Sequence, residues 1–307
     1  MVFHNLFCKG ICIMKKKFSL LLLFLILIVC VSSVGYVKYH SNENNNAAKI
    51  EKIKNKDLKI VALGDSLTQG VGDPTNKGGY VSRIQNKLKD NGFKKITTYN
   101  YGIAGQRSDQ INKRINNNTN NLSSQLEKAN LITLTVGGND LLQGLQKNAL
   151  VDSHDTFEKN MDREVQKYKD NLSILLKNIR KYNNKAPVYI FGIYNPIYVY
   201  FANVSVINEY VGQINDITQN QIANNYKMHF VDISFLSYGQ YNTKEKQRKL
   251  RDMNQDTSPF DVNKLSNANG EINDYISPKD HFHPNNLGYN YMTNQLFSKI
   301  NKFNDWG

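Results

Sequence analysis

Four short stretches of this 307-residue chain combine the residue types that acyl transfer requires. Acyl transfer needs a nucleophile, a base, a group that orients the base, and donors aimed at the developing oxyanion. The stretches are Gly64-Asp65-Ser66-Leu67, residues 100–105 (Asn-Tyr-Gly-Ile-Ala-Gly), Gly137-Gly138-Asn139-Asp140 and Asp280-His281-Phe282-His283-Pro284. Together they supply every part of a serine-dependent acyl-transfer site.

Each part can be assigned to a side chain or a backbone group. Ser66 is the predicted nucleophile, and His283 is the predicted base. Asp280, three residues before His283, is near enough on a turn to hold its Nδ1–H and fix the tautomer. Asn139 offers a side-chain amide, and Gly105 and Ser66 offer backbone N–H groups, as oxyanion donors.

These assignments have alternatives. Ser66 could be a turn residue or a helix N-cap, and Asn139 could cap the helix that follows it. His281 could replace His283 as the base, although it lies too close to Asp280 along the chain for the same hydrogen bond. Both histidines and Asp280 could be metal ligands, but the chain offers no further histidine or cysteine cluster, so we expect no metal.

Strand-like and helix-like patterns alternate along the body of the chain. Short apolar runs predict strands at 58–63, 96–101, 131–136, 187–193 and 229–233. Apolar positions at helical spacing predict helices at 80–88, 157–182, 206–226 and 285–303, with polar helical segments in 108–126. This alternation predicts an α/β fold with a mostly parallel sheet covered on both faces. Residues 236–274 have the least regular pattern, and we expect an irregular segment there.

The position of the motifs relative to the strands supports the assignment. Ser66 follows the predicted strand at 58–63, and the motifs that contain Gly105 and Asn139 follow the next two strands. In open α/β sheets ligands bind at the carboxyl ends of the strands. We therefore expect these residues to be displayed at one edge of the sheet.

In this order, the four motifs resemble those of the SGNH hydrolases, also called GDSL-type esterases and lipases. They match the Ser, Gly, Asn and His blocks of that family across the body of the chain. The resemblance implies a three-layer α/β/α sandwich similar to flavodoxin for residues 57–307, without a cofactor. It implies Ser66 as nucleophile, Asp280 and His283 as the rest of the triad, and Ser66, Gly105 and Asn139 as the oxyanion hole.

The first 56 residues differ from the body in composition. Lysines at positions 15–17 precede an uncharged apolar run at 18–37, which is long enough for a bilayer-spanning helix. By the positive-inside rule we expect residues 1–17 in the cytoplasm, a single transmembrane anchor or uncleaved signal at 18–37, a solvated linker at 38–56, and an extracytoplasmic domain at the cell membrane. The arrangement resembles the membrane-anchored lipase/acylhydrolase branch found in bacteria. A cleaved signal peptide, or a lipoprotein signal at Cys30, is the alternative.

Charge and cysteine content limit the range of functions. The net charge of +13 favours anionic partners such as lipid headgroups or wall polymers. The basic residues form no block interleaved with aromatic residues, so we expect no nucleic-acid partner. The three cysteines, Cys8, Cys12 and Cys30, precede the body, which excludes a disulfide framework or a cysteine nucleophile in the folded domain.

These observations predict a serine esterase or lipase that hydrolyses acyl or acetyl esters of small molecules, lipids or glycans. The alternative is a catalytically idle module of the same fold that binds envelope glycan or lipid. The intact motifs favour the enzyme. An aromatic group after the predicted strand at 187–193 could line an acyl pocket or belong to the core: Tyr194, Tyr198, Tyr200 and Phe201.

Overall fold

The structure is a computed structural model that describes residues 51–223, 225–253 and 272–306. The chain divides into two compact units, Met1–Lys54 and Asn55–Gly307. Of the first unit only residues 51–54, which are helical, are described. None of the described helices is long and apolar enough to span a bilayer, and the predicted span at 18–37 lies outside the described residues.

The second unit is built on a five-stranded parallel sheet with the order β2-β1-β3-β4-β5. The strands are β1 (Asp57–Gly64), β2 (Lys95–Gly102), β3 (Leu131–Thr135), β4 (Val188–Phe191) and β5 (Met228–Val231). In the central pairs, Val61 lies opposite Tyr99 on one side and Ile132 on the other. The prediction of a parallel sheet is confirmed, because all five predicted strands are present and run in one direction.

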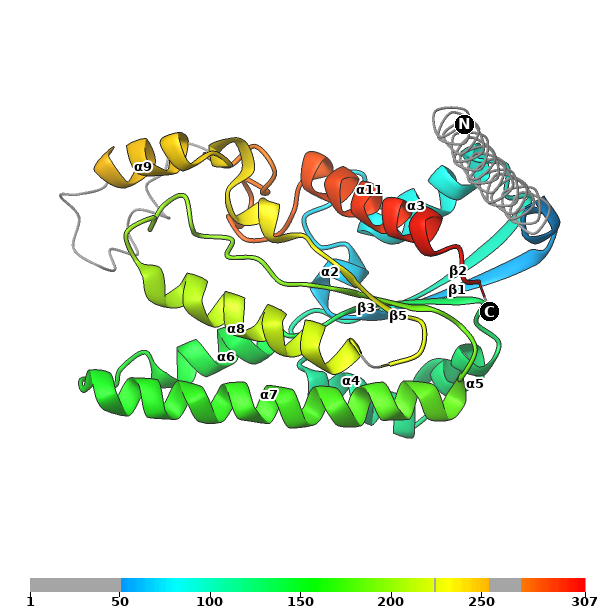
Figure 1. Ribbon diagram of the computed structural model, residues 1–307, viewed down its shortest axis with the longest axis horizontal. Coiled ribbons are helices and arrows are strands. Elements are labelled where there is room, and N and C mark those ends of the chain that lie inside the picture. Colours follow the sequence, from blue (N-terminus) through cyan, green and yellow to red (C-terminus); the bar gives the residue numbers. More distant parts are fainter. Residues whose placement is uncertain (1–50, 224, 254–271, 307) are drawn as a thin grey trace, which may run out of the picture. The chain divides into compact units, whose positions relative to one another are not determined.

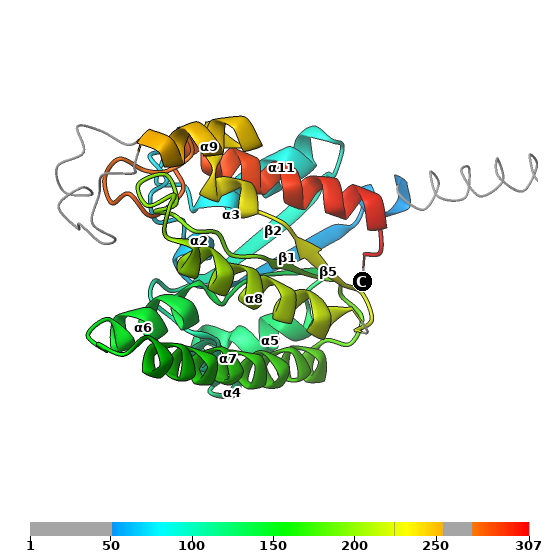
Figure 2. The same cartoon turned by 60° about the vertical axis from the view of Figure 1, so that its left-hand side comes forward.

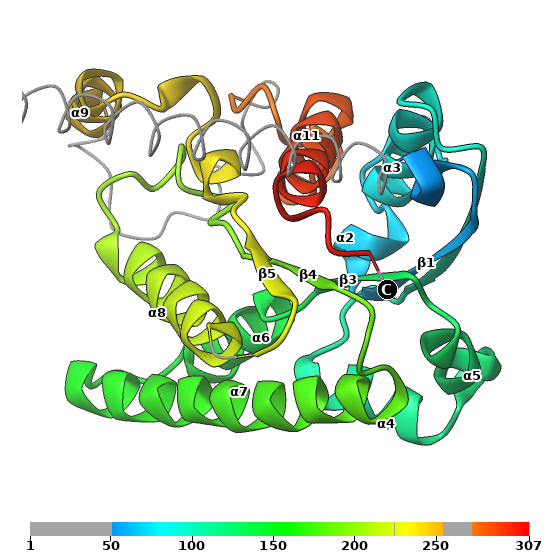
Figure 3. The same ribbon diagram turned by 45° about the vertical axis from the view of Figure 1, so that its right-hand side comes forward.

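Helices connect the strands and cover the sheet. They are α2 (Ser66–Gln69), α3 (Gly79–Asp90), α4 (Ser108–Asn116), α5 (Leu122–Glu127), α6 (Gly138–Asn148), α7 (His154–Tyr182), α8 (Ser205–Ile222), α9 (Lys244–Met253) and α11 (Asn286–Phe303), with short 3₁₀ turns at Thr119–Asn121, Ser234–Ser237 and Gly239–Tyr241. Helices α3 and α11 lie on one face of the sheet, and α4, α5, α7 and α8 lie on the other (Figure 1 and Figure 3). The three-layer α/β/α arrangement is therefore as predicted.

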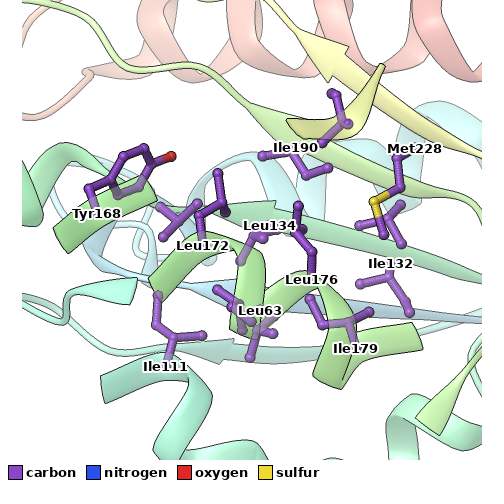
Figure 4. Packing of buried hydrophobic residues seen from close by; sticks show 14 of the residues in the cluster. Leu63, Ile111, Ile132, Leu134, Tyr168, Leu172, Leu176, Ile179, Ile190 and Met228 are labelled. Atoms are coloured by element: carbon purple, nitrogen blue, oxygen red, sulfur yellow. The ribbon is translucent and has the colours of Figure 1, made fainter. Parts of the chain in front are cut away.

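The side chains of each strand point alternately to the two faces of the sheet, so the core has one half on each face. Val61 and Leu63 of β1 belong to the cluster under α7, whereas Ile60 and Ala62, also buried, have the opposite side-chain direction. Figure 4 shows the apolar stripe of α7 lying against the strands; its labelled members are Tyr168, Leu172, Leu176 and Ile179. The spacing of three and four residues in this stripe fits one face of an α-helix. On the other face the Tyr80 ring of α3 packs against the Phe191 ring of β4, with 4.7 Å between the ring centroids.

The bounds of several elements differ from the sequence prediction by one to three residues, and two differences are larger. Helix α8 ends at Ile222, four residues before the predicted end at 226. Residues 244–253 form helix α9, so the expectation of an irregular segment was wrong there. Leu250 is buried, and most of the other residues of this helix are charged. So few apolar positions give no helical periodicity from which α9 could be predicted. Residues 254–271 of the same predicted segment lie outside the described residues.

Candidate active site

The turn that presents Ser66 is fixed by polar contacts beneath it. A Cβ atom on Gly64 would collide with Thr135 Oγ1, so only glycine allows strand β1 to end this close to β3. The Asp65 carboxylate accepts hydrogen bonds from the Leu67 N–H at 3.0 Å and from Thr135 Oγ1 at 2.7 Å. Burial raises the pKa of Asp65, and these hydrogen bonds oppose that rise. Asp65, rather than Ser66, is thus the N-cap of α2, and the alternative of Ser66 as the cap is wrong.

Ser66 follows this cap at the carboxyl edge of the sheet, which is the end toward which β1 points in Figure 2. Its side chain is nearly buried, with 6% of the residue exposed. Within the described part of the chain, neither the Ser66 hydroxyl nor its backbone N–H makes a hydrogen bond. Both groups are therefore available to a bound molecule.

Asp280 and His283 form a hydrogen-bonded pair. His283 Nδ1 lies 2.8 Å from Asp280 Oδ2, and Asp280 Oδ1 accepts the backbone N–H groups of Phe282 and His283 at 3.0 Å each. Partial burial would raise the pKa of Asp280, but these hydrogen bonds outweigh burial and lower it. Asp280 is consequently a carboxylate at neutral pH, so Nδ1 carries the proton and Nε2 is left as a base.

The Asp280–His283 pair lies beside the turn that carries Ser66. A Cβ atom on Gly72 would lie only 2.8 Å from His283 Cβ, which shows how closely the segment after α2 packs against this histidine. Ser66 Oγ and His283 are not hydrogen bonded to each other, as is common before substrate binds.

His281, the competing base, points to a different partner. Its backbone is left-handed, with φ of 52°. Its Nδ1 lies 3.2 Å from the Tyr200 hydroxyl, and the two rings meet edge to face. The side chain that faces the Asp280 carboxylate is that of His283.

Asn139 and Gly105 come together through the loop after β2. Asn139 Nδ2 donates to the Gln106 carbonyl at 3.1 Å, which leaves one amide hydrogen for another acceptor. The alternative of Asn139 as a helix cap is wrong, because α6 is capped at Gly137 without any side-chain hydrogen bond. Gly105 has φ of +80° and is exposed. Its N–H has no protein acceptor within the described ranges.

Comparison with known proteins places the chain in a family. Residues 62–291 match the GDSL-like lipase/acylhydrolase family. The chain belongs to this family. It is therefore a carboxylic ester hydrolase, as the motifs predict.

Individual relatives of this acylhydrolase are distant. It is 26% identical over 289 residues to the uncharacterized protein YpmR of Bacillus subtilis (strain 168), covering 94% of this chain and 96% of YpmR. It is 28% identical over 167 residues to the spore germination lipase LipC of Bacillus licheniformis, covering 52% of this chain and 72% of LipC.

Solved structures share the fold. The lipase Lip_vut3 from a goat rumen metagenome superposes with a TM-score of 0.59 at 22% identity, covering 78% of this chain and 96% of that chain. The lipase/acylhydrolase from Enterococcus faecalis gives a TM-score of 0.50 at 16% identity, covering 80% of this chain and 96% of that chain. At these identities the likeness concerns the fold alone.

Two adjoining cavities open at the site of the acylhydrolase. The smaller, about 40 Å³, is lined by Ser66 and Asn139 among others. The larger, about 170 Å³, is mostly apolar and lies between α6 and α8. Both are lined by Gly138, Ile193, Tyr194, Pro196 and Phe282. The larger cavity is thus a continuation of the space beside Ser66.

The aromatic group after β4 is divided between these cavities and the core. Tyr194 lines both cavities, and its hydroxyl donates to the Phe282 carbonyl at 2.8 Å. The other three members, Tyr198, Tyr200 and Phe201, pack in a separate buried cluster with Leu250 of α9. Of these four aromatic residues, Tyr194 is the one that lines the described cavities.

Several residues that shape the site were not found from the sequence. Thr135 supports Asp65, and two glutamines, Gln69 and Gln143, bond to the loop that carries Gly105. Isolated glutamines in a polar chain carry no signal of their own. Thr135, at the end of a predicted strand, could have been noticed because a polar residue interrupts an apolar run.

Proposed function

We propose that this acylhydrolase cleaves carboxylic esters with Ser66 as nucleophile, His283 as general base and Asp280 as the group that orients His283. The observation that carries the proposal is the 2.8 Å Asp280–His283 hydrogen bond beside the buried turn of Ser66. The N–H groups of Ser66 and Gly105 and the Asn139 amide are the proposed oxyanion donors. The available hydrogens on all three groups support this assignment.

The reaction follows from these roles. Ser66 Oγ attacks the ester carbonyl while its proton passes to His283 Nε2, and the carbonyl oxygen becomes an anion held by the three donors. His283 then gives the proton to the departing alcohol, which leaves an acyl group on Ser66. Water attacks that acyl group with His283 again as base, and the carboxylic acid is released. Asp280 stabilises the imidazolium in both halves without taking the proton.

The apolar cavity indicates the acyl side of the substrate. Its volume of about 170 Å³ is close to that of an apolar cavity of ~150 Å³ that holds benzene. A chain of about six carbons therefore fits, whereas an acetyl group leaves most of the cavity empty. Leu142 and Leu145 of α6 and Ile207 of α8 line it. We infer that esters of acids with about six carbons are better substrates than acetate esters.

The test is a series of p-nitrophenyl esters from acetate to decanoate, hydrolysed by the full-length protein. We expect the highest kcat/KM near hexanoate, and we expect Leu142→Trp, which fills the cavity, to lower kcat/KM for hexanoate by up to about 200-fold relative to acetate. Each buried methylene contributes about 0.8 kcal/mol, and hexanoyl exceeds acetyl by four. Leu150→Trp is the matched control, because Leu150 follows α6 and is 94% exposed.

The outcomes separate the alternatives. If no ester is hydrolysed and Ser66 is not labelled by a fluorophosphonate, the proposed role of Ser66 fails and the alternative of a catalytically idle module is favoured. If Leu142→Trp and Leu150→Trp share the wild-type chain-length profile, the acyl chain is bound elsewhere.

We further propose that residues 18–37 anchor the enzyme in the cell membrane, with the catalytic domain outside. The uncharged run after the lysines at 15–17 motivates this proposal. The full-length protein should fractionate with membranes, and its domain should be digested by protease added to wall-stripped cells. Recovery of a shortened soluble form from the medium would show instead that the segment is a cleaved signal.

A further inference from the structure

The loop that carries Gly105 is held by side chains from two helices. Gln69 Oε1, at the end of α2, accepts the Ala104 N–H at 2.7 Å. Gln143 Nε2, on α6, donates to the Gly105 carbonyl at 2.8 Å. Asn139 Nδ2 donates to the next carbonyl, that of Gln106, at 3.1 Å. Three peptide groups of the loop, those at 103–104, 105–106 and 106–107, are thus fastened to α2 or α6, and the Ala104–Gly105 peptide lies between them.

The peptide between the two glutamine contacts is the one that ends in the Gly105 N–H. Its neighbours are anchored on one side at the Ala104 N–H and on the other at the Gly105 carbonyl. The Gly105 N–H itself has no acceptor in the described part of the protein. A hydrogen bond from the Gln106 N–H to the Ile103 carbonyl at 3.4 Å closes the turn around this peptide. The two glutamines add contacts on either side of the donor without occupying it.

Packing does not hold this loop in place. Ile103, Ala104 and Gly105 are all exposed, and a Cβ atom on Gly105 would meet nothing within 4 Å. Glycine is needed at position 105 because φ is +80°, not because space is short. Since apolar contacts are few, the orientation of the Gly105 N–H depends on the polar contacts.

The amide of Gln143 is itself oriented. Its Oε1 accepts a hydrogen bond from Arg107 Nη1, and Arg107 pairs with Asp109 at 3.0 Å. Arg107 can only donate, so the oxygen of the Gln143 amide must face it and the NH₂ must face the Gly105 carbonyl. A glutamate at position 143 would keep the contact with Arg107 and lose the donor toward Gly105.

We infer that Gln69 and Gln143 are positioning residues that hold the Gly105 N–H in the direction required by the oxyanion. The inference rests on the proposed function and extends it to two residues outside the recognised motifs. Preorganised donors stabilise the transition state more than the ground state, so a displaced donor lowers kcat with little effect on KM.

The test compares substitutions that differ in hydrogen-bonding polarity. Gln69 acts only as an acceptor toward Ala104, so Gln69→Met should lower kcat and Gln69→Glu should restore most of the loss. Gln143 acts as a donor toward Gly105, so Gln143→Glu should lower kcat about 10- to 100-fold with KM changed less than about threefold. Gln146→Glu is the matched control, because Gln146 is an exposed residue of the same helix. Melting temperatures are measured for every variant.

Opposite responses to glutamate at positions 69 and 143, at equal melting temperature, support the inference. Equal kcat for Gln143→Glu and Gln146→Glu overturns it, and so does a change confined to KM. Ser66→Ala is assayed in parallel. If Ser66→Ala is inactive while Gln143→Glu is unaffected, only the positioning role fails; if Ser66→Ala keeps full activity, the proposed function fails.

Discussion

Replacing Ser66 with alanine is expected to reduce kcat by about 10³-fold or more without unfolding the protein, and His283→Ala is expected to have a comparable effect. The members of a catalytic triad act as a unit, so removal of either one leaves only the catalysis that the oxyanion donors and substrate binding provide. Ser66 Oγ makes no hydrogen bond to any described residue, so its loss leaves no buried group unpaired. Esterase kinetics and the melting temperature of each variant are the measurements.

His281→Ala is the matched control for the base. His281 differs from His283 by two positions but contacts Tyr200 instead of Asp280. We expect His281→Ala to keep kcat within a few-fold of wild type. An inactive His281→Ala together with an active His283→Ala would show that the base has been assigned to the wrong histidine.

The sheet could be predicted from the sequence because a buried parallel strand appears as an uninterrupted apolar run. All five residues of β3 are buried, and β1 is buried on both faces over most of its length. Ser66 and Asn139 follow these two neighbouring strands directly. Their meeting at one cavity therefore follows from strand direction and strand order.

The supporting contacts could not be predicted, since they depend on how separate elements pack. Gln143 and Gly105 are 38 residues apart, and only the placement of α6 beside the loop after β2 brings them together. The apolar cavity has the same origin. Leu142 of α6 and Ile207 of α8 would each be read as ordinary core-facing residues, and the space between them is a property of two helices.

Asn139→Ala is expected to lower kcat about 10²- to 10³-fold, or ~3 kcal/mol, with little change in KM. The physical reason is that its amide has one hydrogen committed to the Gln106 carbonyl, so the other has a fixed direction before substrate binds. A donor placed in advance for the oxyanion contributes to the transition state and hardly to the ground state. Steady-state kinetics on a soluble ester, with kcat and KM determined separately, are the measurement.

Asn139→Ala also removes the hydrogen bond to the Gln106 carbonyl. Asn148→Ala is the control for this effect, because it too removes a hydrogen bond from a side-chain amide of α6 to a backbone carbonyl. Asn148 is a buried residue of α6 whose amide donates to the Gly144 carbonyl at 2.8 Å, on the same helix but away from the cavity that Ser66 lines. We expect Asn148→Ala to lower the melting temperature while kcat stays near wild type. If Asn139→Ala behaves in the same way, or changes only KM, Asn139 supports the loop and does not bind the oxyanion. A large fall in kcat for Asn139→Ala at unchanged melting temperature would support the assignment of the Asn139 amide as an oxyanion donor.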